Sequence, residues 1–524
     1  MTSRLTPFSK FLMTLAILAG IFFLGRYVLN NTSFGKGLKE KSQEVGSNTT
    51  SPTSDAETSG PLSKEAINVG VVTWGGYIGG QYFNEGFKAN SQSRFLKEYG
   101  FPVEFKILDD VPVSREAWKK DAVHLLWCTI DALPTEIAGL ADYDPVVVFQ
   151  ADWSRGGDAI VVRRGINSVA DLKGKKIAVA EMTPSHSFLL WMLEAGGLKA
   201  TDVEIIKQGS AIDAAQVFKS QQVDAAVVWS PDDVACLKDV PGSRILESTR
   251  SASNIIADAF IAKRSWLEKN QEKVQKLYQG WMIGAAEINA SETNKKKAAK
   301  ILADGLTGFS EEDALGAINN VRLCTHGDNL NFFGLNTEYK GVSAEQLYSR
   351  MTNLYKGLGY AEGKIPSWRT IFYSDAIKSA TALTGPEHSG EGQKVFTKAN
   401  ENEAKTKEAI ATKHVSISFR TGEFQLDENS KYIIDKEFVE IAKGFSNSRI
   451  RIEGNTDNVG SEASNIILSK KRAQSVVDYL VNTHKMSRNR FVVIGNGPNK
   501  SISTNDTEEG RAKNRRTDFE LIGD

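Results

Sequence analysis

Short apolar runs alternate with helical patterns through the middle of this 524-residue chain. The runs are four to eight residues long, rich in Val and Ile, and bounded by turn-forming residues, which is typical of strands. They cover Ile67–Thr73, Val103–Ile107, Val123–Trp127, Pro145–Gln150, Ala159–Arg163, Lys176–Ala180, Val203–Lys207 and Ala225–Trp229. Because helical patterns separate several runs, the sequence predicts an α/β architecture with parallel sheets. Residues from Ser265 to about Asn320 are expected to be mostly helical.

Composition limits the classes of function. Hydrophobic residues make up 41% of the chain, enough for two or three packed domains. Lys plus Arg equals Asp plus Glu at 64 each, so no global basic face predicts a nucleic-acid partner. Three cysteines, Cys128, Cys236 and Cys324, leave at least one thiol unpaired, and the spacing does not decide whether two of them form a disulfide.

Three motifs lie near the C-terminus in a fixed order. They are Gly-Asn-Thr-Asp-Asn-Val-Gly at 454–460, Leu-Ser-Lys-Lys-Arg-Ala at 468–473 and Gly-Arg-Ala-Lys-Asn-Arg-Arg at 510–516. Together they resemble the OmpA-like peptidoglycan-binding domain, a small α+β module, over residues 414–524. The resemblance implies a bacterial envelope protein held to the cell wall.

The chemistry of such a pocket requires one fixed anion and one fixed cation, because the ligand carries both an ammonium and a carboxylate. Asp457 lies in a glycine-flanked turn after a strand-like run, and Arg472 lies in an amphipathic helix. An arginine binds a carboxylate bidentately, which a lysine does not. The resemblance implies that Asp457 binds the ammonium of diaminopimelate in the stem peptide and that Arg472 binds its carboxylate.

Three further residues belong to this expected pocket. By the same resemblance Asn465 and Arg515 support it, and Thr456 precedes the aspartate. One position departs from the family pattern, because the family often has His where this chain has Asn455.

The N-terminal segment carries an apolar run over residues 8–29, preceded by Arg4 and Lys10. We expect an uncleaved signal-anchor transmembrane helix, with residues 1–29 forming the cytoplasmic tip and the span. A cleaved signal peptide is the alternative, although the residues after the run are not small. The expected location is the inner membrane, single-pass, with the bulk of the chain in the periplasm. Polar composition predicts linkers at 30–65, disordered, and at 385–413.

The middle of the chain carries a second, looser resemblance. The segments that carry it are 171–180, 183–190 and 222–232. They resemble periplasmic substrate-binding proteins of the nitrate, sulfonate and taurine type, which are related to the binding components of phosphate ABC transporters. The resemblance implies a type II two-lobed fold over residues 66–384, with the ligand in the cleft between the lobes.

An anion site is expected at the start of one helix in this region. Thr183 is a candidate cap, Pro184 suits the first helical position, and Gly196-Gly197 end the pattern. Free N–H groups at Ser185, His186 and Ser187 then favour a sulfonate, phosphate, nitrate or carboxylate group on the ligand. An ordinary capped helix without a ligand is the alternative.

Other residues are expected to hold the rest of the ligand. Trp74, Trp127, beside Thr129, and Trp229 follow or end strand-like runs and are candidates for an aromatic wall, with core packing as the alternative for each. Asp232 and Asp158 are candidates for an ammonium, which makes a zwitterion such as taurine a candidate ligand, or they are turn residues.

The sequence therefore predicts a membrane-anchored periplasmic solute-binding protein attached to peptidoglycan, with an ABC-type permease as the expected membrane partner. The alternative is a structural or signalling tether between inner membrane and wall, in which the binding lobe recognises another envelope protein. No catalytic or phosphate-loop motif occurs, so we expect neither an enzyme nor a cofactor or metal.

Overall fold

The computed structural model describes residues 66–417, 419–420 and 422–523. The expected membrane segment at 8–29 and the expected linker at 30–65 lie outside these residues. Within the described ranges, no helix combines the length and the apolar character that crossing a membrane requires.

The first lobe is built on a mixed sheet with the strand order β11-β4-β10-β3-β1-β2. Its strands are β1 (Ile67–Val71), β2 (Val103–Ile107), β3 (Leu125–Thr129), β4 (Pro145–Ser154), β10 (Ala257–Lys263) and β11 (Val321–Leu323). β1 pairs in parallel with β2 and β3, whereas β10 is antiparallel to β3 and β4.

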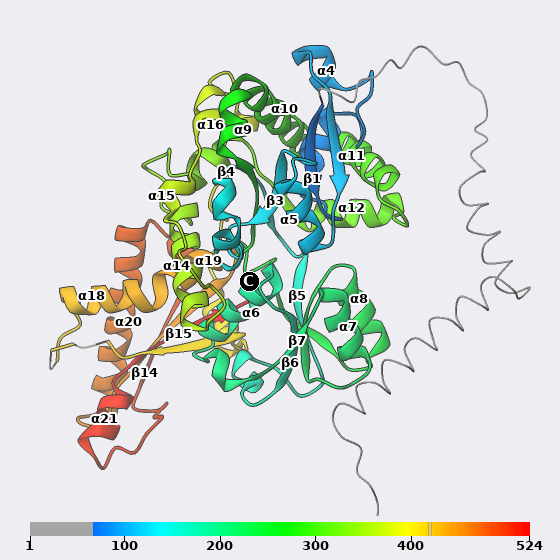
Figure 1. Ribbon diagram of the computed structural model, residues 1–524. Coiled ribbons are helices and arrows are strands. Elements are labelled where there is room, and N and C mark those ends of the chain that lie inside the picture. The colour runs from blue at the N-terminus through cyan, green and yellow to red at the C-terminus, as the bar shows by residue number, and fades with distance from the viewer. Residues whose placement is uncertain (1–65, 418, 421, 524) are drawn as a thin grey trace, which may run out of the picture. The chain divides into compact units, whose positions relative to one another are not determined.

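The second lobe, in which β5, β6 and β7 are labelled in Figure 1, has the strand order β7-β6-β8-β5-β9. Its strands are β5 (Asp158–Val162), β6 (Lys176–Ala180), β7 (Glu204–Gln208), β8 (Ala225–Trp229) and β9 (Arg244–Ser248). α7 (Ala211–Lys219) and α8 (Asp232–Asp239) cover one face of this sheet, and α6 (Pro184–Ala195) covers the other.

All eight predicted runs contain strands, but the expectation of purely parallel sheets is wrong. The chain passes between the lobes through residues 155–157 and 249–256. Strands β5 and β10 follow these crossings directly and enter their sheets at the edge nearest the other lobe. They therefore run antiparallel to β8 and β3, whose last residues reach that same edge. A sequence pattern indicates where strands lie, but it does not indicate whether a strand runs parallel or antiparallel to its neighbours in the sheet.

Helices complete the first lobe. They are α3 (Ile78–Phe83), α4 (Arg94–Tyr99), α5 (Val111–Lys119), α9 (Arg264–Lys269), α10 (Gln271–Ala290), α11 (Glu292–Gly305), α12 (Glu311–Asn319), α13 (His326–Phe332), α14 (Ala344–Gly357), α15 (Trp368–Ile371) and α16 (Asp375–Ser379). The predicted helical character of residues 265–320 is confirmed. Trp281 of α10 contacts the rings of Phe105, Phe149 and Phe260, which project from three strands, so aromatic packing joins this helix to the sheet.

The C-terminal domain has a four-stranded sheet in the order β12-β15-β13-β14. Its elements are α17 (Glu401–Thr406), β12 (Ala411–Val415), α18 (Glu428–Ile434), α19 (Glu440–Gly444), β13 (Arg449–Asn455), α20 (Glu462–His484), β14 (Phe491–Gly497), α21 (Glu508–Asn514) and β15 (Thr517–Ile522). α20 lies close against the sheet at Gly454. A Cβ on Gly454 would lie 2.1 Å from the Ser469 carbonyl oxygen, so only glycine fits there.

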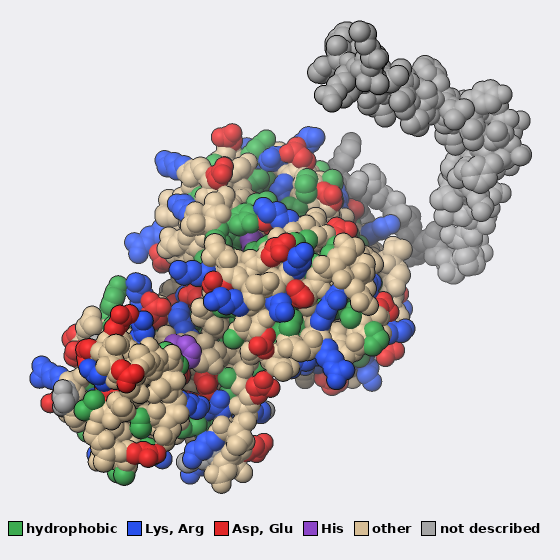
Figure 2. All heavy atoms as spheres, turned by 90° about the horizontal axis from the view of Figure 1, so that it is seen from below, with side chains coloured by type: hydrophobic (Ala, Val, Ile, Leu, Met, Phe, Trp, Pro, Cys, Tyr) green, Lys and Arg blue, Asp and Glu red, His purple; other side chains and the backbone are tan. Residues whose placement is uncertain are grey.

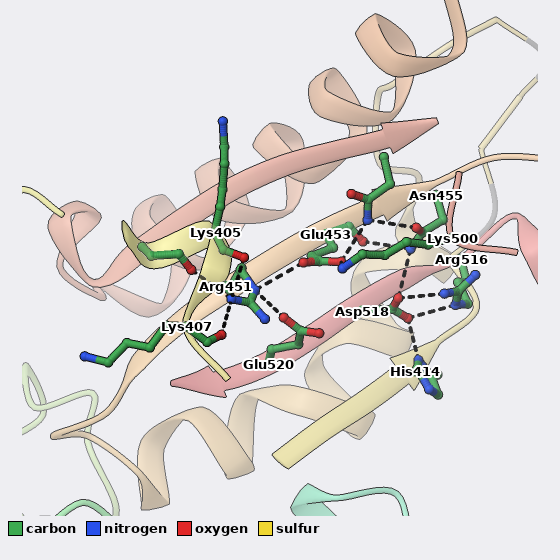
Figure 3. Close-up of polar contacts among 12 residues, drawn as sticks. Lys405, Lys407, His414, Arg451, Glu453, Asn455, Lys500, Arg516, Asp518 and Glu520 are labelled. Carbon is green, nitrogen blue, oxygen red and sulfur yellow. Dashed lines mark hydrogen bonds and ion pairs between the residues drawn. The ribbon is translucent and has the colours of Figure 1, made fainter. Parts of the chain in front are cut away.

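Charged side chains form a buried network on this sheet (Figure 3). Arg451 and Glu453 alternate along β13 with Ile450 and Ile452, as the two-residue repeat of a strand requires. Arg451 Nε lies 3.1 Å from a Glu453 oxygen and also pairs with Glu520. Its Nη1 donates to the Ala404 and Lys407 carbonyls, at 2.8 and 2.7 Å, which holds the α17 segment to the sheet.

Asn455, the departure from the family pattern, belongs to the same network. Its Nδ2 donates to Asp518 at 2.9 Å, and its Oδ1 accepts from Asn496 Nδ2 at 3.0 Å. His414 and Arg516 contact the same aspartate, at 2.6 and 2.9 Å. The Asn455 side chain therefore stabilises the sheet, beside the expected ligand pocket.

Gly284 of α10 provides a test of the helix packing in the first lobe. A Cβ there would lie 2.1 Å from the Gly79 carbonyl oxygen, so Gly284→Ala must separate α10 from α3. We expect a loss of roughly 2–3 kcal/mol in unfolding free energy, measured by denaturant titration.

Gly316 is the matched control, because it lies inside α12 with open space around its Cβ position. Gly316→Ala should leave stability unchanged or raise it by up to about 1 kcal/mol. Equal effects of the two substitutions would contradict the packing described.

Candidate functional site

The ends of five strands meet where the two lobes adjoin. In the second lobe, Asp158 at the start of β5 pairs with Trp229 at the end of β8. In the first lobe, Asp258 near the start of β10 pairs with both Thr129, the last residue of β3, and Asp152 near the end of β4. The two chain crossings thus bring strand ends from both lobes to one edge, where loops and side chains surround a cleft.

A narrow cavity of about 30 Å³ lies at this edge, and the empty space around it, open solvent included, comes to about 360 Å³. Its lining combines aromatic, acidic and small polar side chains from both lobes: Val72, Thr73, Trp74, Trp127, Thr129, Asp158, Pro184, Trp229, Ile256 and Asp258. Five of the residues singled out in the sequence therefore share one cavity: Trp74, Trp127, Thr129, Asp158 and Trp229.

Two glycines permit this close arrangement. A Cβ on Gly157, in the first crossing, would lie 2.1 Å from the Trp74 ring, and a Cβ on Gly76 would lie 1.8 Å from the Asp152 carboxylate. Both positions place backbone where a larger residue would displace the wall of the cavity. The Trp74 indole N–H donates to Asp152 at 3.3 Å, which fixes the ring at the cleft.

Buried carboxyl groups gather around the cavity. Asp131, Asp152, Asp158 and Asp258 are each at most 5% exposed. Ser154 Oγ donates to Asp158 Oδ2 at 2.7 Å, and the Tyr77 hydroxyl donates to Asp258 Oδ1 at 2.5 Å. Among the described residues, the second oxygen of Asp158, Oδ1, has no hydrogen-bond partner.

Burial shifts the acidity of all four groups in one direction. Loss of water raises the pKa of Asp158 to about 7, against the bond from Ser154, and nearby Asp131 and Asp233 raise it further. Burial likewise raises the pKa of Asp131 to about 7. Burial raises the pKa of Asp152 to about 8, and the nearby Asp158 carboxyl adds to the rise. Burial and the charge of Asp152 raise the pKa of Asp258. Near neutral pH, part of these carboxyl groups are therefore protonated.

At the expected anion site of α6, most of the hydrogen-bonding groups already have partners within the protein. The helix runs from Pro184 with Gly196 after its last residue, as predicted, but Thr183 Oγ1 donates to the Ala180 carbonyl instead of capping it. The N–H groups of His186 and Ser187 already donate to the Thr183 carbonyl, at 3.0 and 3.2 Å.

The side chains at this helix start are also engaged. Ser185 Oγ accepts the Trp229 indole N–H at 2.7 Å, so Ser185 orients one wall of the cavity. His186 is fully buried between Tyr355 and Tyr360, and burial lowers its pKa to about 4, which keeps it neutral. Asp232, at the start of α8, does not line the cavity, whereas its neighbour Asp233 is buried with an unpaired oxygen among the described residues.

Four buried polar residues of the cleft were not singled out in the sequence: Tyr77, Asp131, Asp152 and Asp258. Asp152 lies within the ten-residue strand β4, which the sequence pattern predicted to end earlier, at Gln150. β10, which carries Asp258, was not predicted at all. An aspartate at the apolar end of a strand is the signal that could have marked Asp152 and Asp258.

In the C-terminal domain, the expected pocket residues Asp457 and Arg515 are in contact. Arg515 Nη1 lies 2.7 Å from Asp457 Oδ2, and the other carboxylate oxygen accepts the Val459 N–H at 3.1 Å. Thr456 Oγ1 donates to the Asp457 carbonyl at 2.8 Å, and Asn465 Nδ2 donates to the Val459 carbonyl at 3.0 Å. These bonds fix the turn that presents the Asp457 carboxylate.

Arg472 lies on α20 beside this turn. Its guanidinium donates to the Glu423 carbonyl at 3.0 Å and stacks on the Phe419 ring, 4.8 Å from the ring centre. Burial lowers its pKa, the Asp457 charge raises it and the Arg515 charge lowers it, so the three charges lie within range of one another. Arg472 and Arg515 line one surface hollow together. The structure thus brings the predicted anion and cations to one place.

In the view of Figure 2, the surface shows no patch made of a single sign of charge. Basic and acidic side chains are intermixed over the face shown, in keeping with equal totals of 64 each. All three cysteines, Cys128, Cys236 and Cys324, are buried free thiols.

Comparison with known proteins agrees with both parts of the fold. Residues 418–515 match the OmpA family, and residues 132–291 match the family described as NMT1/THI5 like. The chain thus contains one region similar to the NMT1/THI5-like family and a second, C-terminal region similar to the OmpA family. Both resemblances drawn from the sequence motifs are thereby confirmed.

Individual relatives match one part or the other. The chain is 26% identical over 204 residues to a protein named "Putative binding protein" in Brucella abortus (strain 2308), covering 38% of this chain and 62% of the relative. It is 29% identical over 183 residues to outer membrane protein A of Bordetella avium, covering 35% of this chain and 89% of that protein.

Two further similarities concern a single domain or the fold. A peptidoglycan-binding protein of Mycobacterium tuberculosis is 44% identical over 77 residues, covering 15% of this chain and 23% of that protein. The structure of the periplasmic aliphatic sulphonate binding protein from Escherichia coli aligns with a TM-score of 0.47 at 21% identity, covering 60% of this chain and all of that one.

The buried carboxyl groups predict an unusual dependence of stability on pH. A raised pKa in the folded state means that the folded protein binds more protons than the unfolded one, so stability falls as pH rises. With a pKa of about 7 for Asp158 in the fold and the usual value when unfolded, wild type should lose about 1 kcal/mol relative to Asp158→Asn between pH 6 and pH 8. Thermal unfolding of both proteins measures this difference, and a constant difference across the range would contradict it.

Proposed function

We propose that this protein is a solute receptor of the bacterial envelope whose C-terminal domain attaches it to peptidoglycan. The cavity between the lobes carries this proposal, since it gathers three tryptophans and two carboxylates from both lobes at the crossing segments. Closure of the lobes on a small charged solute would complete such a site.

The C-terminal pocket supplies the second activity. A diaminopimelate stem peptide presents an ammonium and a carboxylate a short distance apart, and Asp457 and Arg472 offer the opposite charges. Because Arg515 holds one oxygen of Asp457, the bound ammonium shares that carboxylate with Arg515 or displaces it. The ligand's carboxylate then meets Arg472 without leaving a charge unpaired.

The anchoring of the chain completes the proposal. Residues 8–29 would hold the protein to the inner membrane as a single-pass anchor, with the receptor in the periplasm. An ABC-type permease is the proposed partner for transport. If the cavity binds no solute, the chain acts instead as a tether between membrane and wall.

Binding to the wall is tested by sedimentation with purified peptidoglycan. Asp457→Ala and Arg472→Ala each remove a charged hydrogen-bonding partner, a loss of roughly 1.5–3 kcal/mol. We expect ten- to a hundredfold weaker binding in each variant, measured as the fraction of protein pelleted across a range of peptidoglycan concentrations.

Arg488→Ala is the matched control, because Arg488 is half exposed in the same domain and pairs only with Asp478 among the ion pairs of the described residues. It should pellet like wild type. Wild-type sedimentation of the Asp457 and Arg472 variants would overturn the pocket assignment.

A further inference from the structure

We propose that the cavity between the lobes selects a positively charged nitrogen group, as a free amine or quaternary ammonium or as the cationic end of a zwitterion, over a bare anion. The inference deepens the proposed receptor function and rests on it. The inference is drawn from the aromatic and acidic side chains that line the cavity.

Three indole rings wall the cavity. Trp74 comes from the loop after β1, Trp127 lies near the end of β3, and Trp229 ends β8. Two of the rings are fixed by hydrogen bonds, Trp74 to Asp152 and Trp229 to Ser185. Tryptophan faces attract cations most strongly among the aromatic side chains, and a set of them around one cavity is the arrangement that binds ammonium groups.

The titratable side chains that line the cavity are acidic, so any charge they carry is negative. Asp158 and Asp258 are in the lining, and no Lys or Arg is among the described residues that form it. The Asp158 side chain is 2% exposed, and its Oδ1 lacks a partner among the described residues. A buried carboxylate oxygen left unpaired beside an open cavity is a site for a donor that the ligand brings.

The surrounding charges do not reverse this sign. Arg115 stacks on Trp127, but its guanidinium makes two hydrogen bonds to Glu136, at 2.6 and 2.8 Å. Other ionisable groups lie farther from the cavity, near its carboxyl groups. Asp131, Asp152, Asp233, Tyr77 and Cys324 are acidic or neutral. The two arginines are paired, Arg155 with Glu391 and Arg322 with Asp328. A bare nitrate or sulfonate would therefore face carboxylates with no cation in the lining to balance it.

The start of α6 does not supply the missing positive charge. Ser185 Oγ accepts a bond from Trp229, and the His186 and Ser187 N–H groups are bound to Thr183. The unpaired indole N–H of Trp127 remains, among the described residues, as a donor for a hydroxyl or sulfonate oxygen at the ligand's other end. The lining thus fits an ammonium with a small polar tail.

The test compares matched compounds that differ only in the charged nitrogen. Thermal unfolding of the full protein at pH 7.5 is measured with choline against its uncharged isostere 3,3-dimethylbutan-1-ol, and with taurine against ethanesulfonate, with nitrate as a further anion. We expect at least one ammonium compound to raise the midpoint, while its matched partner and nitrate do not. A rise with ethanesulfonate or nitrate equal to that with the ammonium compounds would overturn the inference and leave the receptor function standing. No rise with any compound would overturn both.

Variants then locate the site for a compound that binds. Asp158→Asn keeps the shape and removes the charge, so we expect at least tenfold weaker binding by calorimetry, with the protein still folded. Trp229→Phe keeps a smaller ring and should weaken binding by less. Asp239→Asn, an exposed carboxylate of the same lobe, should bind like wild type. Wild-type affinity in Asp158→Asn would overturn the assignment of this carboxylate.

Proton release gives an independent readout. An ammonium favours the ionised form of the carboxylates, so binding should release protons and tighten as pH rises from 6 to 8. Calorimetry in two buffers of different ionisation enthalpy measures the release. A compound that binds without releasing protons, and equally well at pH 6 and pH 8, would contradict binding at these carboxylates.

Discussion

The removal of water from four carboxyl groups at one sheet edge is the constraint on which the binding region depends. Charged groups resist burial, and no Lys or Arg of the described residues lines the cavity beside these carboxyl groups, so the fold stabilises the protonated forms instead. The Tyr77 and Ser154 hydroxyls and the Trp74 indole each donate to one of these carboxyl groups. The same bonds fix the walls of the cavity. The residues proposed to recognise a ligand therefore also affect stability, which is common at functional sites with perturbed pKa values.

The C-terminal domain handles charge differently. Its sheet buries Arg451 with Glu453 and Glu520, and Asp518 with Arg516, so each carboxylate there meets a cation within the fold. This network leaves the Asp457 turn and Arg472 beside it, both anchored by backbone bonds. Asp457, paired with Arg515, and Arg472 beside it place both signs of charge on a rigid frame, which would suit a ligand that carries both signs. The two parts of the chain thus offer two kinds of recognition.

The sequence predicted what depends on local pattern. Strand runs, the α6 boundaries and the grouping of Trp74, Trp127 and Trp229 follow from periodicity and from strand ends. The missed features depend on chain direction: β10 pairs antiparallel with two strands, and Asp258 meets Asp152 and Thr129 only through that pairing. The expected anion site is reduced because the Thr183 carbonyl accepts the N–H groups of His186 and Ser187. Such competition among partners within the fold leaves no mark in a one-dimensional pattern.

The central claim is that the cleft holds protonated carboxyl groups near neutral pH. Infrared absorption of the ligand-free protein tests it directly, because a protonated carboxyl and a carboxylate absorb at different frequencies. We expect a protonated-carboxyl band at pH 6 that fades by pH 8.5 and is weaker in Asp158→Asn. A spectrum at pH 6 with carboxylates alone would contradict it.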